Sequence, residues 1–116
     1  MVLDTDYRST DGSAIRDFVH VSDICSAHSL ALDYLLADGP NTQFNLGGQE
    51  GFSVFEVIRA TEAVLGCAVP FSLEPRRVGD PAILLADSRA ARQELHWKPS
   101  RSELAAMIAD AAAALP

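Results

Sequence analysis

The sequence has little cysteine and fewer basic than acidic residues. Its two cysteines, Cys25 and Cys67, lie far apart and match neither a C-x-x-C pair nor the Cys/His spacing of a zinc site, so we expect reduced thiols. Nine lysines and arginines stand against sixteen aspartates and glutamates, which gives a net charge of −7. Nucleic acids and anionic membranes bind basic patches, so this balance predicts neither of them as a partner.

Long apolar runs are absent as well. Met1 is followed by Asp4 and Asp6 rather than by a basic and then an apolar run, so no secretory signal peptide is indicated. The alanine-rich stretch from Leu104 to Leu115 is too short to span a bilayer, and it contains Asp110. We therefore expect a cytoplasmic protein. Its 116 residues, of which 48% are apolar, are enough for one domain.

A turn, a strand and a helix start follow one another early in the chain. Asp11 and Gly12 form a turn signal, because glycine tolerates positive φ and aspartate bonds its own backbone. The apolar run from Ile15 to Val21 then predicts a buried strand. Arg16 and Asp17 lie within this run, and burying charge is costly unless the charge is paired or meets a charged ligand. Two interpretations stay open: a structural ion pair and a polar ligand site.

Hydrophobic periodicity and capping residues predict four helices. Ser22 or Asp23 would cap the first, which ends near Ala37 before Asp38-Gly39-Pro40. Its expected apolar stripe is Ile24, Ala27, Ala31, Tyr34 and Leu35. The second helix is expected from Val54 to Leu65, with a capping box of Ser53 and Glu56 and an end at Gly66; its inward residues are Val57, Ile58, Ala60 or Thr61, and Leu65. The third is a short helix from Ser88 to Leu95, capped by Asp87. The last is capped by Ser100 and Glu103, and its inward residues are Leu104, Met107, Ile108, Ala111 and Leu115.

Further strands are expected around these helices. Residues 1–10 read as the end of a strand and a loop, so we expect additional chain before them. Gln43 to Leu46 reads as a short strand, and the run from Val69 to Leu73 alternates as a half-buried strand does. Trp97 is expected to anchor the core rather than to stack on a ligand.

A glycine loop follows the strand that ends at Leu46. Gly47-Gly48-Gln49-Glu50-Gly51 lies between a strand and a helix, as a dinucleotide-binding loop does, but its spacing is not G-x-G-x-x-G. No acidic ribose ligand stands about twenty residues further on, so a structural turn is favoured over phosphate binding. Asp17, His20 and Asp23 could suggest a metal site, but they cross a strand-to-helix junction and are not expected to converge.

Two adjacent arginines, Arg76 and Arg77, lie in a loop bounded by Pro75 and by Gly79-Asp80-Pro81. Proline and glycine restrict such a loop, so its side chains are held. The planar guanidinium matches phosphate oxygens well, and a hydrogen bond to a charged group contributes roughly 1.5 to 3 kcal/mol. The residues alone leave a solvated loop and an anion site as alternatives.

Two motifs carry a resemblance to a known family. Asp-Gly-Ser-x-x-Arg-Asp-Phe-Val-His-Val-Ser-Asp at 11–23 and Pro-Arg-Arg-x-Gly-Asp at 75–80 resemble segments of extended short-chain dehydrogenase/reductases that act on nucleotide sugars, most of all UDP-glucose 4-epimerases. The resemblance implies that Arg16 and Arg77 contact the pyrophosphate of a UDP-sugar and that Asp80 meets the ribose. Phe-Asn-Leu-Gly at 44–47 resembles a late sheet strand of the same enzymes.

The resemblance covers nearly all of this chain but only about the final third of such enzymes. It implies an α/β fold: mixed small sheet elements with helices, forming over residues 1–116 the C-terminal substrate-binding portion. The NAD-binding Rossmann domain is not expected here, because the sequence shows neither Gly-x-x-Gly-x-x-Gly nor Tyr-x-x-x-Lys. In the full-length family NAD takes hydride from C4 of the sugar and returns it to the other face. We expect this chain to bind no NAD alone and to be inactive alone.

The expected partners are a UDP-sugar and another polypeptide, either a second copy or a complementing N-terminal chain. The strand pieces are apolar enough to need sheet neighbours. Three alternatives stay open. The chain could be a non-catalytic module that binds nucleotide sugars, an interaction domain whose arginines only pair with acidic neighbours, or part of another NDP-sugar epimerase or dehydratase.

Overall fold

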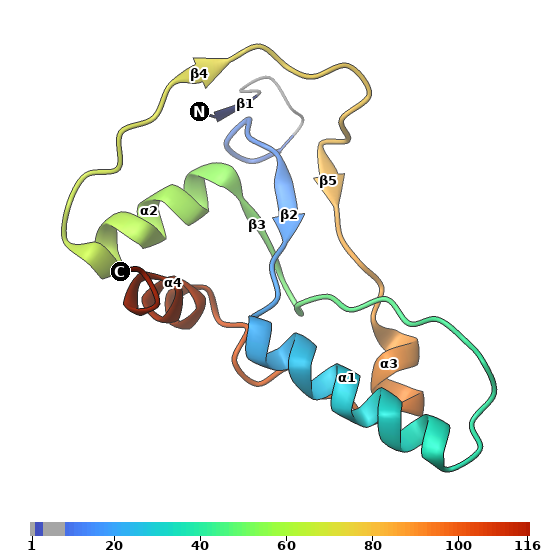
Figure 1. Cartoon of the computed structure of the whole chain (residues 1–116). Coiled ribbons are helices and arrows are strands. Elements are labelled where there is room, and N and C mark those ends of the chain that lie inside the picture. The colour runs from blue at the N-terminus through green and yellow to red at the C-terminus, as the bar shows by residue number, and fades with distance from the viewer. Residues whose placement is uncertain (1, 4–8) are drawn as a thin grey trace.

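A mixed three-stranded sheet lies between two pairs of helices (Figure 1). The computed structural model describes residues 2–3 and 9–116; of the strand end and loop predicted over residues 1–10, residues 1 and 4–8 lie outside these ranges. The elements are β1 (Val2–Leu3), β2 (Ile15–Asp17), α1 (Val21–Leu36), β3 (Gly51–Ser53), α2 (Val54–Leu65), β4 (Leu73–Glu74), β5 (Ile83–Leu84), α3 (Arg89–Glu94) and α4 (Leu104–Ala113).

Strand β2 is the centre of the sheet. It runs antiparallel to β3, with Arg16 opposite Phe52, and parallel to β5, with Arg16 opposite Leu84. A separate parallel pair joins β1 to β4. The expected α/β class is confirmed, with helices α2 and α4 on one side of the sheet and α1 and α3 beyond its lower end (Figure 1).

The turn before β2 is closed by the carboxylate of Asp11. It accepts hydrogen bonds from the Ser13 amide at 3.0 Å, the Ser13 hydroxyl at 2.7 Å and the Ser53 hydroxyl at 2.5 Å. Partial burial raises the pKa of Asp11, but these hydrogen bonds, first the one from Ser53, outweigh it and hold the pKa below its usual value. The turn is thereby fixed to the end of β3.

The second helix has the predicted bounds, capping box and end. Ser53 and Glu56 form the capping box, α2 spans Val54–Leu65, and Gly66 ends it at φ 69°, in the left-handed region that favours glycine. Its inward side chains are half-buried, except that Leu65 is exposed.

The predicted caps of α1 and α4 are wrong. His20 caps α1, because its Nδ1 accepts from the Ser22 amide at 2.9 Å. Asp23 lies in the first turn and is buried. Helix α4 begins at Leu104, with Glu103 at its N-cap position and no side-chain cap, and the Ser100 amide donates to Asp23. A tertiary contact has replaced the local capping pattern in both places.

Asp23 and Trp97 form the centre of the lower core. Trp97 is 1% exposed and its indole Nε1 donates to the Asp23 carbonyl at 2.9 Å. The Asp23 carboxylate, in turn, accepts from the amides of Ser100 and Arg101 and from the Ser102 hydroxyl at 2.6 Å. The predicted role of Trp97 as a core anchor is confirmed. Its buried companions are Ala27, Ala91 and Leu95.

The apolar stripe of α1 differs from the prediction. Ala27 is buried and Ala31 and Tyr34 are half-buried, as expected, but Ile24 and Leu35 are exposed. The core-facing stripe is rotated toward Asp23 and Leu30, because Asp23 is pulled inward by its hydrogen bonds to the 100–102 loop. In α4, Leu104, Met107 and Ile108 are half-buried and Ala111 is exposed; Leu115, which was predicted to lie inward on this helix, follows its end and is exposed.

Three expected strands are shorter or missing. The strand predicted from Ile15 to Val21 is reduced to β2, whose side chains are half-buried. Residues Gln43 to Leu46 form no strand in the described structure, although Phe44 and Leu46 pack against the lower core in an alternating pattern. The predicted run from Val69 to Leu73 is reduced to β4, in which both side chains are exposed. A strand requires a neighbour to pair with, and sequence alternation does not supply one.

The molecule is flat and extended. Its radius of gyration is 16.7 Å, whereas a compact domain of this length has about 13 Å. Its accessible surface is 7833 Å², against about 6,100 Å² for a typical folded chain of this mass. Much apolar surface therefore stays uncovered. No helix among the described residues is long and apolar enough to cross a membrane.

The Trp97 anchor generates a first prediction. Trp97→Ala should lower the free energy of unfolding by about 3–5 kcal/mol, because it empties the core and frees the Asp23 carbonyl. Trp97→Phe keeps part of the ring volume and should cost less. Denaturant titration followed by circular dichroism measures both. Phe71→Ala, at a residue 48% exposed, is the control. Equal losses for Trp97→Ala and Phe71→Ala would contradict the assignment.

A second prediction concerns pH. The Arg101 guanidinium, at 2.7 Å, and then His20 Nε2, at 2.8 Å, hold the pKa of Asp110 below its usual 3.8. The folded state therefore favours the carboxylate, so its stabilising contribution is present above the unfolded pKa and is lost as pH falls through the lower, folded pKa. Wild type should exceed Asp110→Asn in stability near about pH 5, and the difference should shrink toward about pH 3.

Denaturant titrations at several pH values measure this difference. Asp33→Asn is the matched control, because Asp33 is an exposed carboxylate of α1 whose side chain has no hydrogen bond among the described residues. A gap between wild type and Asp110→Asn that stays constant down to about pH 3 would show that the interaction does not depend on the carboxylate charge.

Candidate functional site

Arg16 lies in the central strand with its guanidinium engaged on one side. Its Nη2 donates to Asp80 Oδ1 at 3.0 Å, and its Nη1 donates to the Ile15 carbonyl at 2.9 Å and the Ala82 carbonyl at 3.5 Å. The pairing of β2 with β5 brings Ala82 and Asp80 here from a distant part of the chain. Arg16 is therefore oriented before any ligand arrives.

Arg77 reaches the same carboxylate from the loop. A turn at Val78-Gly79, with Gly79 at φ 84°, folds the chain back so that the Asp80 amide donates to the Arg77 carbonyl at 3.3 Å. Arg77 Nη2 lies 3.8 Å from Asp80 Oδ2, and its side chain is 72% exposed. The structure thus brings the three predicted residues together, with one arginine at each oxygen of Asp80.

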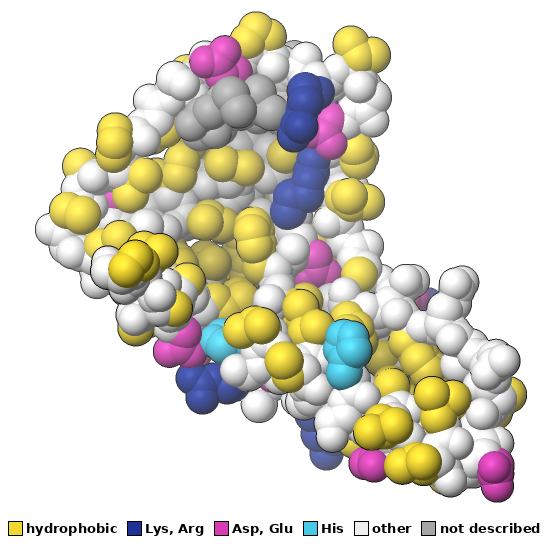
Figure 2. Space-filling view, viewed as in Figure 1, with side chains coloured by type: hydrophobic (Ala, Val, Ile, Leu, Met, Phe, Trp, Pro, Cys, Tyr) yellow, Lys and Arg dark blue, Asp and Glu magenta, His cyan; other side chains and the backbone are white. Residues whose placement is uncertain are grey.

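The site is a local positive region on an acidic protein. Among the described residues, Arg16 and Arg77 both contact Asp80, whereas the whole chain carries −7. Lysine and arginine side chains gather on this face over the upper parts of β2 and β5 (Figure 2). A cluster of guanidinium groups with one carboxylate suits an anion that also presents a hydroxyl.

Asp17 does not pair with Arg16, although the two residues are adjacent. Successive side chains of a strand point to opposite faces. The Asp17 carboxylate instead accepts from the Gly48 amide at 2.7 Å and the Ala86 amide at 3.1 Å. A structural ion pair between Arg16 and Asp17, one of the two interpretations of these adjacent charges, is therefore not formed; Arg16 pairs with Asp80 instead.

The glycine loop makes room for the Asp17 carboxylate and its two hydrogen bonds, which we call the Asp17 clasp. A Cβ on Gly47 would overlap the Asp17 carboxylate, and one on Gly48 would press on the Phe18 carbonyl. The Gly48 amide already donates to Asp17. These glycines allow close approach within the chain, so the loop does not fit a dinucleotide phosphate.

The Asp17, His20 and Asp23 pattern does not converge. His20 Nε2 contacts Asp110 and its Nδ1 accepts from Ser22, while Asp23 binds the 100–102 loop. No group of three or more His, Cys, Asp or Glu side chains suited to a metal ion occurs among the described residues.

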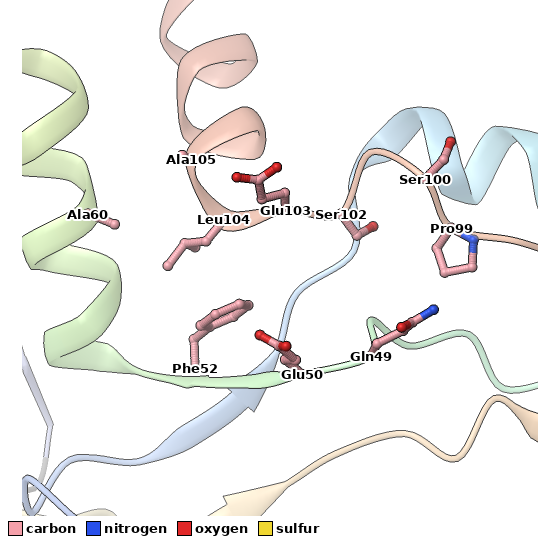
Figure 3. A pocket seen from close by; sticks show the side chains of 10 residues that line it. All are labelled: Gln49, Glu50, Phe52, Ala60, Pro99, Ser100, Ser102, Glu103, Leu104 and Ala105. Atoms are coloured by element: carbon pink, nitrogen blue, oxygen red, sulfur yellow. The ribbon is translucent and has the colours of Figure 1, made fainter.

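A cavity of about 490 Å³ lies between α2, β3 and the start of α4, and no sequence pattern pointed to it (Figure 3). The side chains of Phe52 and Leu104 face each other across it, and the carboxylates of Glu50 and Glu103 lie at its side (Figure 3). None of the predicted site residues lines it. Such a space arises only where elements distant in sequence meet.

Comparisons with known proteins find similarity to epimerases. The model of the NAD dependent epimerase/dehydratase family matches residues 5–47. The UDP-glucose 4-epimerase of Halalkalibacterium halodurans is 45% identical over 107 residues, which are 92% of this chain and 32% of that protein. The enzyme of Streptococcus mutans is 42% identical over 111 residues, 96% of this chain and 33% of its own length.

Solved structures agree with the sequence relatives. The UDP-glucose-4-epimerase of Stenotrophomonas maltophila, solved with bound NAD and formylated UDP-arabinopyranose, superposes with a TM-score of 0.87 and 44% identity, over 94% of this chain and 32% of that one. The Bifidobacterium longum enzyme, in complex with NAD+ and UDP, gives a TM-score of 0.80 and 36% identity over 93% and 32% of the two chains.

The chain is thus a small α/β unit with a mixed three-stranded sheet that matches part of the epimerase fold. More specifically, it is a partial-length homologue of UDP-glucose 4-epimerase. It spans about a third of the length of the curated relatives that it matches, at 32% and 33%.

The Asp17 clasp generates a third prediction. Asp17→Ala leaves two amides without their charged acceptor, and each such hydrogen bond contributes about 1.5–3 kcal/mol, so the free energy of unfolding should fall by about 3 kcal/mol. Denaturant titration measures the loss. The control is Asp33→Ala, on the exposed side of α1. Asp38→Ala is not suitable, because Asp38 has φ 60° and its substitution would add backbone strain to the measured loss. Equal stability of Asp17→Ala and wild type would contradict the clasp.

Proposed function

We propose that this chain is the C-terminal, UDP-sugar-binding portion of a UDP-glucose 4-epimerase-like protein and that it is inactive without an NAD-binding part. The observation that carries the proposal is that Arg16 and Arg77 both contact Asp80. Arg16 and Asp80 are 64 positions apart in the sequence. The homology to UDP-glucose 4-epimerases supports the nucleotide sugar as the ligand.

The proposed anchor uses the two arginines differently. Arg16 is held by backbone carbonyls, so its fork is positioned in advance and loses little freedom on binding. Arg77 is exposed and only loosely paired at 3.8 Å, so it is able to turn from Asp80 toward a diphosphate. Displacing a loose surface ion pair costs little, because such pairs contribute about 0–1 kcal/mol.

Asp80 completes the proposed site. Its carboxylate accepts hydrogen bonds and so matches the hydroxyl groups of a ribose, while its charge keeps both guanidinium groups near one another in the absence of ligand. Holding the nucleotide firmly concentrates binding energy on the part of the substrate that does not react. The sugar is then free to turn while the UDP remains anchored.

One observation favours a second candidate function, in which the arginines have only a structural role. The described donors of Arg16 point to Asp80 and to two carbonyls of the chain itself, as they would in a purely structural arrangement. On this reading the chain is an interaction domain and the arginines have no ligand. Binding of UDP separates the two readings directly.

The shape of the molecule supports a polypeptide partner. An extended chain with a radius of gyration of 16.7 Å leaves large side chains of α1, β4 and β5 exposed. Exposed apolar surface of this kind marks interaction sites in soluble proteins. We infer that the NAD-binding part of the enzyme would come from that partner, because the glycine loop of this chain is occupied by its own Asp17.

The fourth prediction tests the anchor. Isothermal titration calorimetry of the purified chain should show saturable binding of UDP and none of NAD. Arg77→Ala should weaken UDP binding at least about tenfold, because a charged hydrogen bond to phosphate contributes roughly 1.5–3 kcal/mol. Lys98→Ala removes the same charge from an exposed residue outside the cluster and should leave UDP binding unchanged.

Two results would contradict the proposal. Absence of heat with UDP at millimolar concentration would favour the purely structural reading of the arginines. Equal weakening by Arg77→Ala and Lys98→Ala would show that UDP senses only the overall charge of the chain.

A further inference from the structure

We propose that the cavity between α2, β3 and the start of α4 binds a small organic cation that carries an ammonium group on an apolar body. Primary amines with an aromatic ring are the simplest ligands of this class. The inference goes beyond the proposed function, because Arg16, Arg77 and Asp80 do not line this cavity. Its ligand is therefore a second molecule, separate from UDP.

The cavity has the size and the walls of a small-molecule site. Its volume is about 490 Å³, and ligand sites in proteins commonly have about 300–1,000 Å³. The ring of Phe52 and the side chain of Leu104 face each other across it, and Ala60 lies on the wall formed by α2 (Figure 3). A ring placed between Phe52 and Leu104 is removed from water on both of its faces, which favours binding.

The walls of the cavity are held in place without a ligand. Phe52 lies in β3, which pairs with β2, and α4 packs against α2. The loop over residues 100–102 forms another wall. It is fixed by the Asp23 carboxylate, which accepts from the amides of Ser100 and Arg101 at 3.1 and 2.9 Å. A ligand that enters an already formed cavity binds with little loss of freedom in the chain.

Two carboxylates give the cavity its charge. Those of Glu50 and Glu103 lie at its side (Figure 3), and neither has an ion pair or a hydrogen bond within the described part of the chain. No lysine, arginine or histidine occurs among the described residues that line the cavity. Arg101, the cation nearest to Glu103 in the sequence, is paired with Asp110 at 2.7 Å. The amides at the start of α4 contribute about half a positive charge, which two carboxylates outweigh.

An organic cation suits this lining better than a metal ion. Calcium takes about six to eight oxygen ligands. The described residues contain no group of three or more His, Cys, Asp or Glu side chains suited to a metal, and the cavity offers only Glu50 and Glu103 among them. An ammonium group, by contrast, donates hydrogen bonds to carboxylates and is attracted to the face of an aromatic ring such as that of Phe52.

Nuclear magnetic resonance of the full chain tests this assignment. The probe is phenethylamine, which is protonated at neutral pH, and its neutral analogue phenethyl alcohol has the same apolar part. Titration with the amine should shift the amide signals of residues 49–52 and 100–105 in one saturable step. The alcohol should bind at least about tenfold more weakly, because it has no charge to meet the carboxylates.

Matched variants assign the contacts. Glu50→Gln and Glu103→Gln should each weaken binding of phenethylamine at least about threefold and leave binding of phenethyl alcohol unchanged. Glu94→Gln removes the same charge from an exposed residue of α3 outside the cavity and should leave both unchanged. Ala60→Leu fills part of the cavity and should weaken binding of both probes. Circular dichroism of each variant shows that it is folded.

Four results would overturn the inference. These are equal affinity for the amine and the alcohol, shifts that lie outside residues 49–52 and 100–105, no saturable step at millimolar concentration, or equal weakening by Glu94→Gln and Glu103→Gln. Titration of UDP tests the anchor separately. A chain that binds the amine but not UDP contradicts the proposed function alone, and a chain that binds UDP but not the amine contradicts only this inference.

Discussion

The carboxylate of Asp17 is the constraint on which the site depends. It stands at the end of the central strand and binds the amides of Gly48 and Ala86, so three segments of the chain meet at one point. Its hydrogen bonds hold β5 beside β2, and that pairing carries Asp80 to Arg16. Because neighbouring strand residues face opposite ways, one adjacent pair serves both purposes: Asp17 fixes the scaffold and Arg16 faces the ligand region.

Incomplete burial explains the remaining features of the molecule. Apart from Ala14, the buried apolar side chains of the described residues form a small group around Trp97, while α1, β4 and β5 keep large apolar side chains in solvent. The charged cluster and the apolar face of α1 are visible on the same face (Figure 2).

Local signals were predicted well where neighbouring residues decide the structure. The capping box of Ser53 and Glu56 and the left-handed Gly66 define α2 from within its own sequence. By contrast, Asp23 reads as a cap residue in the sequence but binds the 100–102 loop, and Ser100 is used in that same contact instead of capping α4. For Asp23 the error arises because a local cap and a long-range acceptor use the same side-chain oxygens. Ser100 joins this contact through its backbone amide.

The sequence by itself determined the helices, the core role of Trp97 and, through its motifs, the candidate residues Arg16, Arg77 and Asp80. These follow from spacing, hydrophobicity and residue chemistry within short windows. Only the tertiary structure decided which charges pair, because Arg16 meets Asp80 rather than Asp17 through a strand pairing that no local pattern encodes. It also decided that residues 43–46 stay unpaired, since a strand exists only where a second strand lies beside it.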